Sequence, residues 1–206
     1  MIPINNDKQE DQEETPFRII EETRPGKIIH IYFSEAINEA KKFVDLIHKI
    51  KTAGPEDIIY MYLNLPGGYI TTGVQILSAM RMSKAHIVTV VEGEVASLGT
   101  LIFLSADEFI IHDNTLLMIH NHSGGQWGKG HEYLAQADAT SKWFETLARD
   151  VYKNFLTPTE IKEMLDGKDF WFQADEVKTR LEKLVKESQK AAKANEPKTR
   201  TRTTKK

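Results

Sequence analysis

The stretch that decides the fold is Asp57-Ile58-Ile59-Tyr60-Met61-Tyr62-Leu63-Asn64-Leu65-Pro66-Gly67-Gly68. The residues from Ile58 to Leu63 are apolar or aromatic without a break, which is typical of a parallel strand covered on both faces. Pro66 and the two glycines after it then stop the strand, because proline cannot donate to a sheet and glycine favours a turn. We therefore predict a buried strand that ends at a sharp glycine turn.

Strand and helix patterns alternate on either side of this stretch. Before it, residues 27–33 are rich in β-branched and aromatic side chains, and apolar residues recur at helical spacing across residues 36–53. After it come a helix, a strand, a small-residue turn, a helix and two strands, in the ranges 72–82, 85–91, 93–99, 101–106, 108–112 and 116–120. This alternation predicts an α/β domain with a mainly parallel sheet, whose active residues lie at the carboxyl ends of strands.

A glycine-rich segment and a long helix follow the last of these strands. Residues 123–130 contain four glycines, and residues 131–154 carry apolar side chains at helical spacing. A segment of this kind can project from the rest of a domain. A further helix begins at Thr157, where Glu160 occupies the capping-box position.

One domain with a complete core is expected from the length of 206 residues and a hydrophobic fraction of 40%. The absence of cysteine excludes disulfides, a thiolate nucleophile and cysteine-based zinc sites. Residues 1–16 lack the basic-then-apolar order of a secretory signal, and the longest apolar runs, about ten residues, fall short of a membrane span. We expect a soluble cytoplasmic protein that makes no membrane contact.

The two ends of the chain carry opposite charge. Acids outnumber bases in residues 1–26, whereas bases dominate residues 178–206. Residues 190–206 have no aromatic or branched aliphatic side chain, so burial cannot offset the entropy of ordering them and we expect disorder. We divide the chain into an acidic segment (1–26), a folded domain (27–185) and a basic tail (186–206). Such tails are more often solvated than bound, so nucleic acid is not an expected partner.

The residues Gly93-Glu94-Val95-Ala96-Ser97-Leu98-Gly99 place one serine between a buried strand and an apolar helix. A hydroxyl in this context is exposed at a helix N-terminus, where backbone N–H groups stabilise negative charge. The alternative interpretation is that Ser97 only caps the helix and its small neighbours allow tight packing. The serine alone does not distinguish a nucleophile from a cap.

Two backbone amides extend the nucleophile hypothesis. Pro66-Gly67-Gly68 lies one helix and one strand before Ser97, and glycine lets the backbone approach a substrate closely. The N–H groups of Gly68 and Leu98 can then form an oxyanion hole. Without that context, Pro-Gly-Gly is an ordinary turn that only marks the end of a strand.

A general base and an orienting carboxylate are also needed to activate a serine. Two histidines lie at the end of an apolar strand, His120 and His122, and either could act as the base. The alternative interpretation is that each is an ordinary histidine at the surface or at the edge of the core. Alternation along the strand favours His120, which occupies its last position, and His122 is the alternative. Asp169 is the favoured carboxylate, because three aromatic residues follow it and can bury and fix it.

Four motifs in this order resemble the ClpP family of Clp protease proteolytic subunits. They are Leu63 to Gly68, Gly93 to Gly99, Met118 to Asn121 and Asp169 to Glu176, within residues 28–177. The resemblance implies a crotonase-like α/β fold with a mainly parallel sheet and a protruding strand-helix handle at residues 121–154. It also implies a serine endopeptidase that needs no metal and no cofactor.

The resemblance assigns roles residue by residue. Ser97 would be the nucleophile, His120 the base and Asp169 its orienting carboxylate, with Gly68 and Leu98 as oxyanion donors. The residues that would bind or cover the substrate are Gly67, Tyr69, Ile70, Met118, Gly124, Gly125 and Trp127. The implied partners are copies of the same chain, in heptameric rings stacked in pairs as a tetradecamer, a polypeptide substrate and an AAA+ unfoldase.

Several departures from the family pattern bear on these expectations. Leu65 replaces the usual serine, and the usual tyrosine-glycine-leucine ending is missing after Glu176. Residues 19–26 run almost directly into the first strand, without the helical segment that helps form the docking face for unfoldases. Shortened relatives of this kind occur in bacteriophages, so a phage protein in the host cytoplasm is one expectation. The alternative functions are a virion maturation protease, a catalytically silent scaffold subunit and acyl-CoA chemistry on the same fold.

Overall fold

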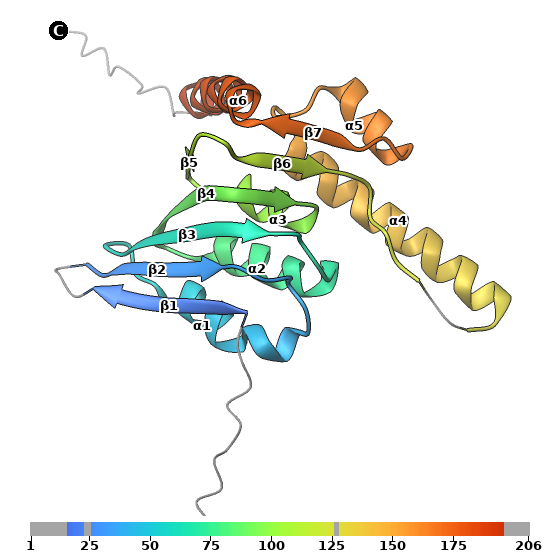
Figure 1. Cartoon of the computed structure of the whole chain (residues 1–206), viewed down its shortest axis with the longest axis horizontal. Helices are drawn as coiled ribbons and strands as arrows, with labels where there is room; N and C mark the ends of the chain where they lie inside the picture. The colour runs from blue at the N-terminus through green and yellow to red at the C-terminus, as the bar shows by residue number, and fades with distance from the viewer. Residues whose placement is uncertain (1–15, 23–25, 126–127, 196–206) are drawn as a thin grey trace, which may run out of the picture.

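Parallel strands at the centre of the sheet follow the alternating pattern of the sequence (Figure 1). The computed structural model describes residues 16–22, 26–125 and 128–195. The parallel strands are β2 (Ile28–Phe33), β3 (Ile58–Leu65), β4 (His86–Ala96), β5 (Glu108–Ile111) and β6 (Leu116–Ile119). The strands β5 and β6 pair with successive parts of β4. The predicted α/β fold with a mainly parallel sheet is therefore confirmed.

Two antiparallel strands border the parallel centre. β1 (Phe17–Glu22) pairs with β2, and β7 (Phe170–Gln173) pairs with β6. The sequence pattern predicts neither strand, because β1 is short, charged and largely exposed and β7 has only four residues. Residues 17–22, which the charge pattern assigns to the acidic N-terminal segment, thus belong to the sheet.

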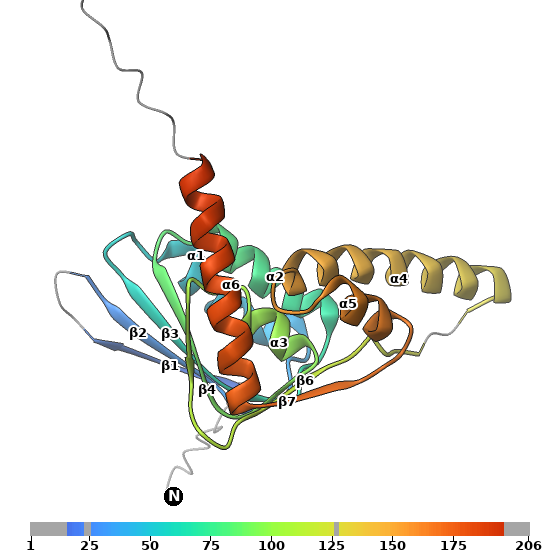
Figure 2. The same cartoon turned by 90° about the horizontal axis from the view of Figure 1, so that it is seen from above.

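One face of the sheet carries the core. Alternate residues of β2 and β3 are fully buried on this face, among them Ile31, Met61 and Leu63. Three helices cover it (Figure 2), namely α1 (Val44–Thr52), which follows a short 3₁₀ turn, α2 (Ile70–Met82) and α3 (Leu98–Phe103). Packing between these helices and the sheet fixes the strand ends that carry the candidate site.

The opposite face of the sheet is only partly covered at β2 and β3, so the prediction of burial on both faces is wrong for β3. His30, Tyr32, Tyr60 and Tyr62 lie on this face and are half-buried. Their rings stack, with the centroids of Tyr32 and Tyr62 4.5 Å apart, and Nδ1 of His30 lies 3.1 Å from the Tyr62 hydroxyl. Tyrosine combines an apolar ring with a polar hydroxyl, so a strand rich in tyrosine tolerates a face that is partly exposed to solvent.

The helix α4 (Gly130–Tyr152) projects from the domain (Figures 1 and 2). Its buried residues lie in its last turns and are Phe144, Ala148, Val151 and Tyr152. Near its start, the side chain of Leu134 is 68% exposed. Residues 121–125 and 128–129, which precede the helix, form no strand. A strand there would need a neighbouring strand to pair with, and none of the described strands pairs with these residues.

Two further helices complete the C-terminal side of the domain. The helix α5 (Pro158–Leu165) begins at the predicted cap, where Thr157 and Glu160 exchange backbone-to-side-chain hydrogen bonds.

The helix α6 (Ala174–Asn195) continues past residue 190. The prediction of disorder is therefore wrong for residues 190–195, where alanine and lysine, which favour helices, extend an existing helix. Of the predicted terminal segments, residues 1–15, 23–25 and 196–206 lie outside the described residues. None of the described helices is both long and apolar enough to cross a lipid bilayer.

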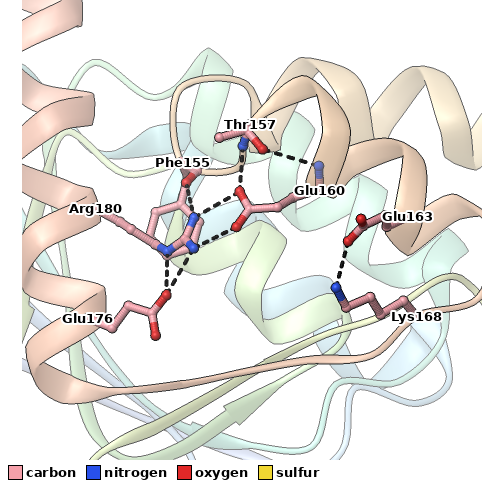
Figure 3. A network of polar contacts seen from close by, with 7 residues as sticks. All are labelled: Phe155, Thr157, Glu160, Glu163, Lys168, Glu176 and Arg180. Atoms are coloured by element: carbon pink, nitrogen blue, oxygen red, sulfur yellow. Dashed lines mark hydrogen bonds and ion pairs between the residues drawn. The ribbon is translucent and has the colours of Figure 1, made fainter.

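One guanidinium group ties these last elements together (Figure 3). Arg180 of α6 makes two hydrogen bonds to the Glu160 carboxylate, at 2.7 and 3.1 Å, and one to the Phe155 carbonyl at 3.1 Å. It also donates to the Glu176 carboxylate at 2.9 Å, and its guanidinium lies 4.4 Å from the centroid of the Phe172 ring in β7. A single side chain thus joins α5, α6 and β7 to the segment that connects α4 to α5.

The Arg180–Glu160 pair predicts a pH-dependent stability. The Arg180 guanidinium lowers the pKa of the Glu160 carboxyl from 4.5 to about 2, against the opposing effect of partial burial. A depressed pKa stabilises the fold above the unfolded-state pKa, and this contribution is lost as the pH falls through the folded-state pKa. We expect Glu160→Gln, which can keep the cap, to lower the free energy of unfolding at pH 7 by about 2 kcal/mol. Denaturant titrations at several pH values should show the deficit shrinking from pH 4.5 towards pH 2.

The matched control is Glu163→Gln. Glu163 pairs with Lys168 at 2.6 Å in the same region, but both side chains are exposed to solvent (Figure 3). We expect this substitution to change the free energy of unfolding by about 0.5 kcal/mol or less. Equal losses in the two variants would contradict the stabilising role assigned to Arg180.

Candidate active site

Ser97 lies at the junction where β4 ends at Ala96 and α3 begins at Leu98. Its backbone has φ 54° and ψ −125°, and a conformation of this kind costs a non-glycine residue about 1–3 kcal/mol. Its N–H donates to the carbonyl of Met118 at 2.8 Å. The predicted turn over residues 93–99 is shorter than expected, since β4 remains a strand up to Ala96. This sharp turn presents the hydroxyl at the carboxyl end of β4.

His120 directly follows β6, whose pairing with the end of β4 brings it next to Ser97. Ala96 of β4 lies opposite Met118 of β6. The His120 Nε2 is 2.7 Å from the Ser97 Oγ, which is within hydrogen-bond distance. When the ring proton is on Nδ1, Nε2 can accept the hydroxyl proton, so this geometry suits a serine and its general base.

His122, the alternative base, is engaged with other groups. Its Nδ1 lies 3.0 Å from Oδ1 of Asn121, and its Nε2 lies 3.5 Å from Oγ of Ser141. The ring also packs against Phe144, with the centroids 5.2 Å apart. Of the two histidines, the geometry therefore favours His120 as the partner of the serine.

Asp169 lies in the loop immediately before β7. Because β6 and β7 are antiparallel and Ile119 lies opposite Phe170, the next pair in this register is His120 opposite Asp169. Residues opposite each other on adjacent strands have Cβ atoms about 5 Å apart. The Asp169 side chain is exposed, and within the described part of the chain no hydrogen bond joins it to His120. The register thus runs towards this pair, but among the described residues no hydrogen bond joins the carboxylate to the imidazole.

The Pro-Gly-Gly turn after β3 packs against the Ser97 junction. Gly67 has φ 97° and Gly68 has φ 147°, conformations that L side chains rarely adopt. A Cβ on Gly67 would lie 2.8 Å from the Cβ of Ser97 and 2.9 Å from the backbone nitrogen of Leu98. A Cβ on Gly68 would collide with the carbonyl of Ile37. Only glycine fits at these two positions.

Two backbone amides beside Ser97 donate to no acceptor among the described residues. Ile37 donates to the Gly67 carbonyl at 2.8 Å, and Tyr69 donates to the Ile37 carbonyl at 2.7 Å. This parallel bridge directs the N–H of Gly68 away from Ile37. Leu98 is the first residue of α3, so its N–H has no acceptor within the helix. Neither amide donates a hydrogen bond to any described residue, and both residues line the same cleft.

A cleft of about 470 Å³ surrounds Ser97 and His120. Of the predicted substrate-binding residues, those that line it are Tyr69, Ile70, Gly124 and Gly125. Gly67 and Met118 do not line it, because Gly67 is buried behind Ser97 and Met118 contributes its backbone carbonyl to the Ser97 junction. Trp127 lies outside the described residues.

The motifs do not predict the wall that α4 adds to the cleft. The lining side chains from this helix are Gln136, Thr140, Trp143, Phe144 and Tyr152. Helical spacing predicts the helix, but it does not say which strand ends the helix faces. No Asp, Glu, Lys or Arg among the described residues lines the cleft. The described residues also contain no cluster of three side chains able to hold a metal ion.

Comparison with known proteins shows which family this chain resembles. The Clp protease family matches residues 11–180. ATP-dependent Clp protease proteolytic subunit 2 of Pseudomonas aeruginosa is 29% identical over 155 residues, which cover 73% of this chain and 76% of the relative. ATP-dependent Clp protease proteolytic subunit 3 is 26% identical over 181 residues in Rhizobium meliloti and 28% over 180 residues in Rhizobium etli. Each of these two matches covers 85% of this chain and 92% of the relative.

The family match spans most of the chain and includes every strand of the sheet, from β1 to β7. The Ser97–His120 pair and the glycine turn beside it lie within the matched residues. We conclude that this chain belongs to the Clp protease family.

Proposed function

We propose that this protein is a serine endopeptidase that cleaves peptides or unfolded proteins through an acyl-enzyme intermediate. The observation that carries the proposal is the 2.7 Å contact between Oγ of Ser97 and Nε2 of His120. It lies next to two backbone amides that have no acceptor in the described part of the chain. A hydroxyl within reach of an imidazole can lose its proton as it attacks a carbonyl. The strained backbone of Ser97 supports the same assignment, because strain of this kind gathers at functional sites.

In the proposed cycle, Oγ of Ser97 attacks the scissile carbonyl carbon while Nε2 of His120 takes the hydroxyl proton. The carbonyl oxygen becomes negatively charged and accepts hydrogen bonds from the N–H groups of Gly68 and Leu98. The C–N bond then breaks, His120 gives its proton to the leaving amine, and an ester remains on Ser97. Water, deprotonated by His120, cleaves this ester and restores the serine.

Asp169 is the proposed orienting carboxylate. It would accept a hydrogen bond from Nδ1 of His120, which fixes the tautomer and stabilises the imidazolium that forms during attack. The register of β6 and β7 supports this role, because beyond the pair of Ile119 and Phe170 it continues towards His120 and Asp169. We propose that assembly of the particle favours this hydrogen bond, so that an isolated subunit is weakly active.

Self-association is part of the proposal. The exposed start of α4 and the unpaired segment before it are suited to contact the same elements of another copy, as in a strand-helix handle. We propose stacked heptameric rings that enclose the cleft in a chamber in the cytoplasm. The relatives are named ATP-dependent, and we propose by analogy that an ATP-driven unfoldase supplies protein substrates.

A catalytically silent scaffold subunit is the second candidate function. The observation that favours it is the exposed Asp169 carboxylate, which makes no hydrogen bond to His120 among the described residues. A silent subunit would keep the fold and the ring surfaces without a reactive serine. The reactivity of Ser97 therefore separates the two candidates.

The first prediction concerns that reactivity. A fluorophosphonate probe added to the full chain should form one adduct, on Ser97, which mass spectrometry of proteolytic fragments can locate. We expect Ser97→Ala to abolish labelling and to lower the hydrolysis of a fluorogenic peptide at least about a thousandfold. The control is Ser123→Ala, since Ser123 lines the same cleft without contacting His120. Unchanged hydrolysis in Ser97→Ala, or an adduct only at another residue, would overturn the proposed function.

The second prediction concerns the carboxylate. We expect Asp169→Asn to lower kcat about a hundredfold or more in the assembled particle, because an amide no longer holds the imidazole in its productive tautomer. Asp166→Asn is the control, as Asp166 is exposed in the same loop and pairs only weakly with Lys162, at 3.6 Å. It should leave kcat within about twofold. Full activity in Asp169→Asn would show that another group orients His120.

A further inference from the structure

A buried chain of hydroxyl groups connects α4 to the Ser97 junction. The hydroxyl of Tyr152, the last residue of α4, lies 2.7 Å from Oγ1 of Thr100 in α3. Oγ1 of Thr100 lies in turn 2.7 Å from the carbonyl oxygen of Ser97. The catalytic cycle described above uses neither hydroxyl.

The direction of the hydrogen bonds in this chain follows from its end point. The Ser97 carbonyl can only accept, so Thr100 donates its single hydroxyl proton to it. The Thr100 oxygen must then accept from the hydroxyl of Tyr152. Both hydrogen bonds therefore point in one direction: Tyr152 donates to Thr100, and Thr100 donates to the carbonyl of Ser97.

Burial makes this chain costly to break. Tyr152 is 1% exposed and Thr100 is 0% exposed. Burial raises the pKa of the Tyr152 hydroxyl well above its usual value, against the hydrogen bond with Thr100, so the hydroxyl keeps the proton that it donates. A buried polar group left without a partner costs about 1–3 kcal/mol, which holds both hydroxyls in place.

The group that receives these hydrogen bonds belongs to the peptide unit of the proposed oxyanion hole. The carbonyl of Ser97 and the N–H of Leu98 are part of one planar peptide, so fixing the carbonyl also fixes the direction of the N–H. Thr100 holds this carbonyl twice, through its hydroxyl at 2.7 Å and through its backbone N–H at 3.0 Å. A backbone conformation as costly as that of Ser97 persists only where its surroundings hold it, and these two hydrogen bonds are part of those surroundings.

We propose that Tyr152 and Thr100 are positioning residues, which orient the Leu98 N–H towards the developing oxyanion. They also connect the C-terminal end of α4 to the oxyanion hole. The inference rests on the proposed function, since it gives the Leu98 amide a role in catalysis. Trp143 and Phe144, in the same helix, line the cleft. A displacement of the C-terminal end of α4 thus changes both the cleft lining contributed by this helix and the orientation of the Leu98 N–H.

The test compares the rate of fluorophosphonate labelling per reactive Ser97 in the wild type and in variants of the full chain. The phosphoryl oxygen of the probe occupies the oxyanion position, so a misdirected amide slows the reaction without changing the final stoichiometry. We expect Thr100→Val to slow labelling about tenfold and Tyr152→Phe about three- to tenfold, less than the loss of an oxyanion donor, because the amide remains present. For a peptide substrate, kcat should fall in parallel while KM changes less than about twofold.

Three further variants separate positioning from general stability. Thr100→Ser keeps the hydroxyl and should label within about twofold of the wild type. The double variant of Thr100→Val with Tyr152→Phe should be no slower than Thr100→Val alone, because both changes break one chain. Val151→Ala removes packing from the neighbouring buried residue of α4, and it should lower the melting temperature but leave the labelling rate unchanged.

The outcomes distinguish this inference from the proposed function. If the wild type is labelled at Ser97 and Tyr152→Phe and Thr100→Val react at the wild-type rate, the inference is wrong and the proposed function stands. Slowing in Val151→Ala equal to that in Tyr152→Phe would also overturn it, since packing alone would then explain the effect. If the wild type does not react at Ser97, the proposed function and this inference both fail.

Discussion

The conformation of one peptide unit, between Ser97 and Leu98, is the constraint on which the rest of the site depends. The backbone of Ser97 turns its hydroxyl towards His120, and the same peptide supplies the amide of Leu98. Such a conformation is kept only when its surroundings hold it. Here the N–H of Ser97 is bound by the Met118 carbonyl, and its carbonyl is bound twice by Thr100. Hydrogen bonds to both sides of Ser97 therefore hold the strained backbone conformation that orients its hydroxyl.

The order of the strands explains how residues far apart in sequence meet at this peptide. The strands β3, β4 and β6 are parallel and end at one edge of the sheet, so the glycine turn, Ser97 and His120 come together there. The antiparallel strand β7 begins at that edge, which places Asp169 beside β6. The loop that carries Asp169 is anchored by two contacts. The Asn121 side chain donates to the last carbonyl of α5 at 2.7 Å, and Arg180 joins α5 to β7.

The sequence predicts the centre of the sheet, because parallel strands with apolar runs set their carboxyl ends together. This patterning places Ser97 and the two histidines His120 and His122 at such ends, and the family resemblance adds the choice of Ser97 and His120 as a pair. The edge strands β1 and β7 do not follow from their sequences, since short edge strands depend on a neighbour for their conformation. The tyrosines of β3 appear apolar in the sequence, and only the tertiary packing shows which face the helices cover. The contact between Thr100 and Tyr152 joins residues 52 positions apart, and a lone threonine in an apolar run does not identify its partner.

The measurement that tests the central claim most directly is an experimental structure of the assembled particle with a fluorophosphonate adduct on Ser97. The account predicts a positive φ at Ser97 and a phosphoryl oxygen about 3 Å from the backbone nitrogens of both Gly68 and Leu98. An adduct whose phosphoryl oxygen points away from both amides, or a Ser97 backbone relaxed to a negative φ, would contradict it.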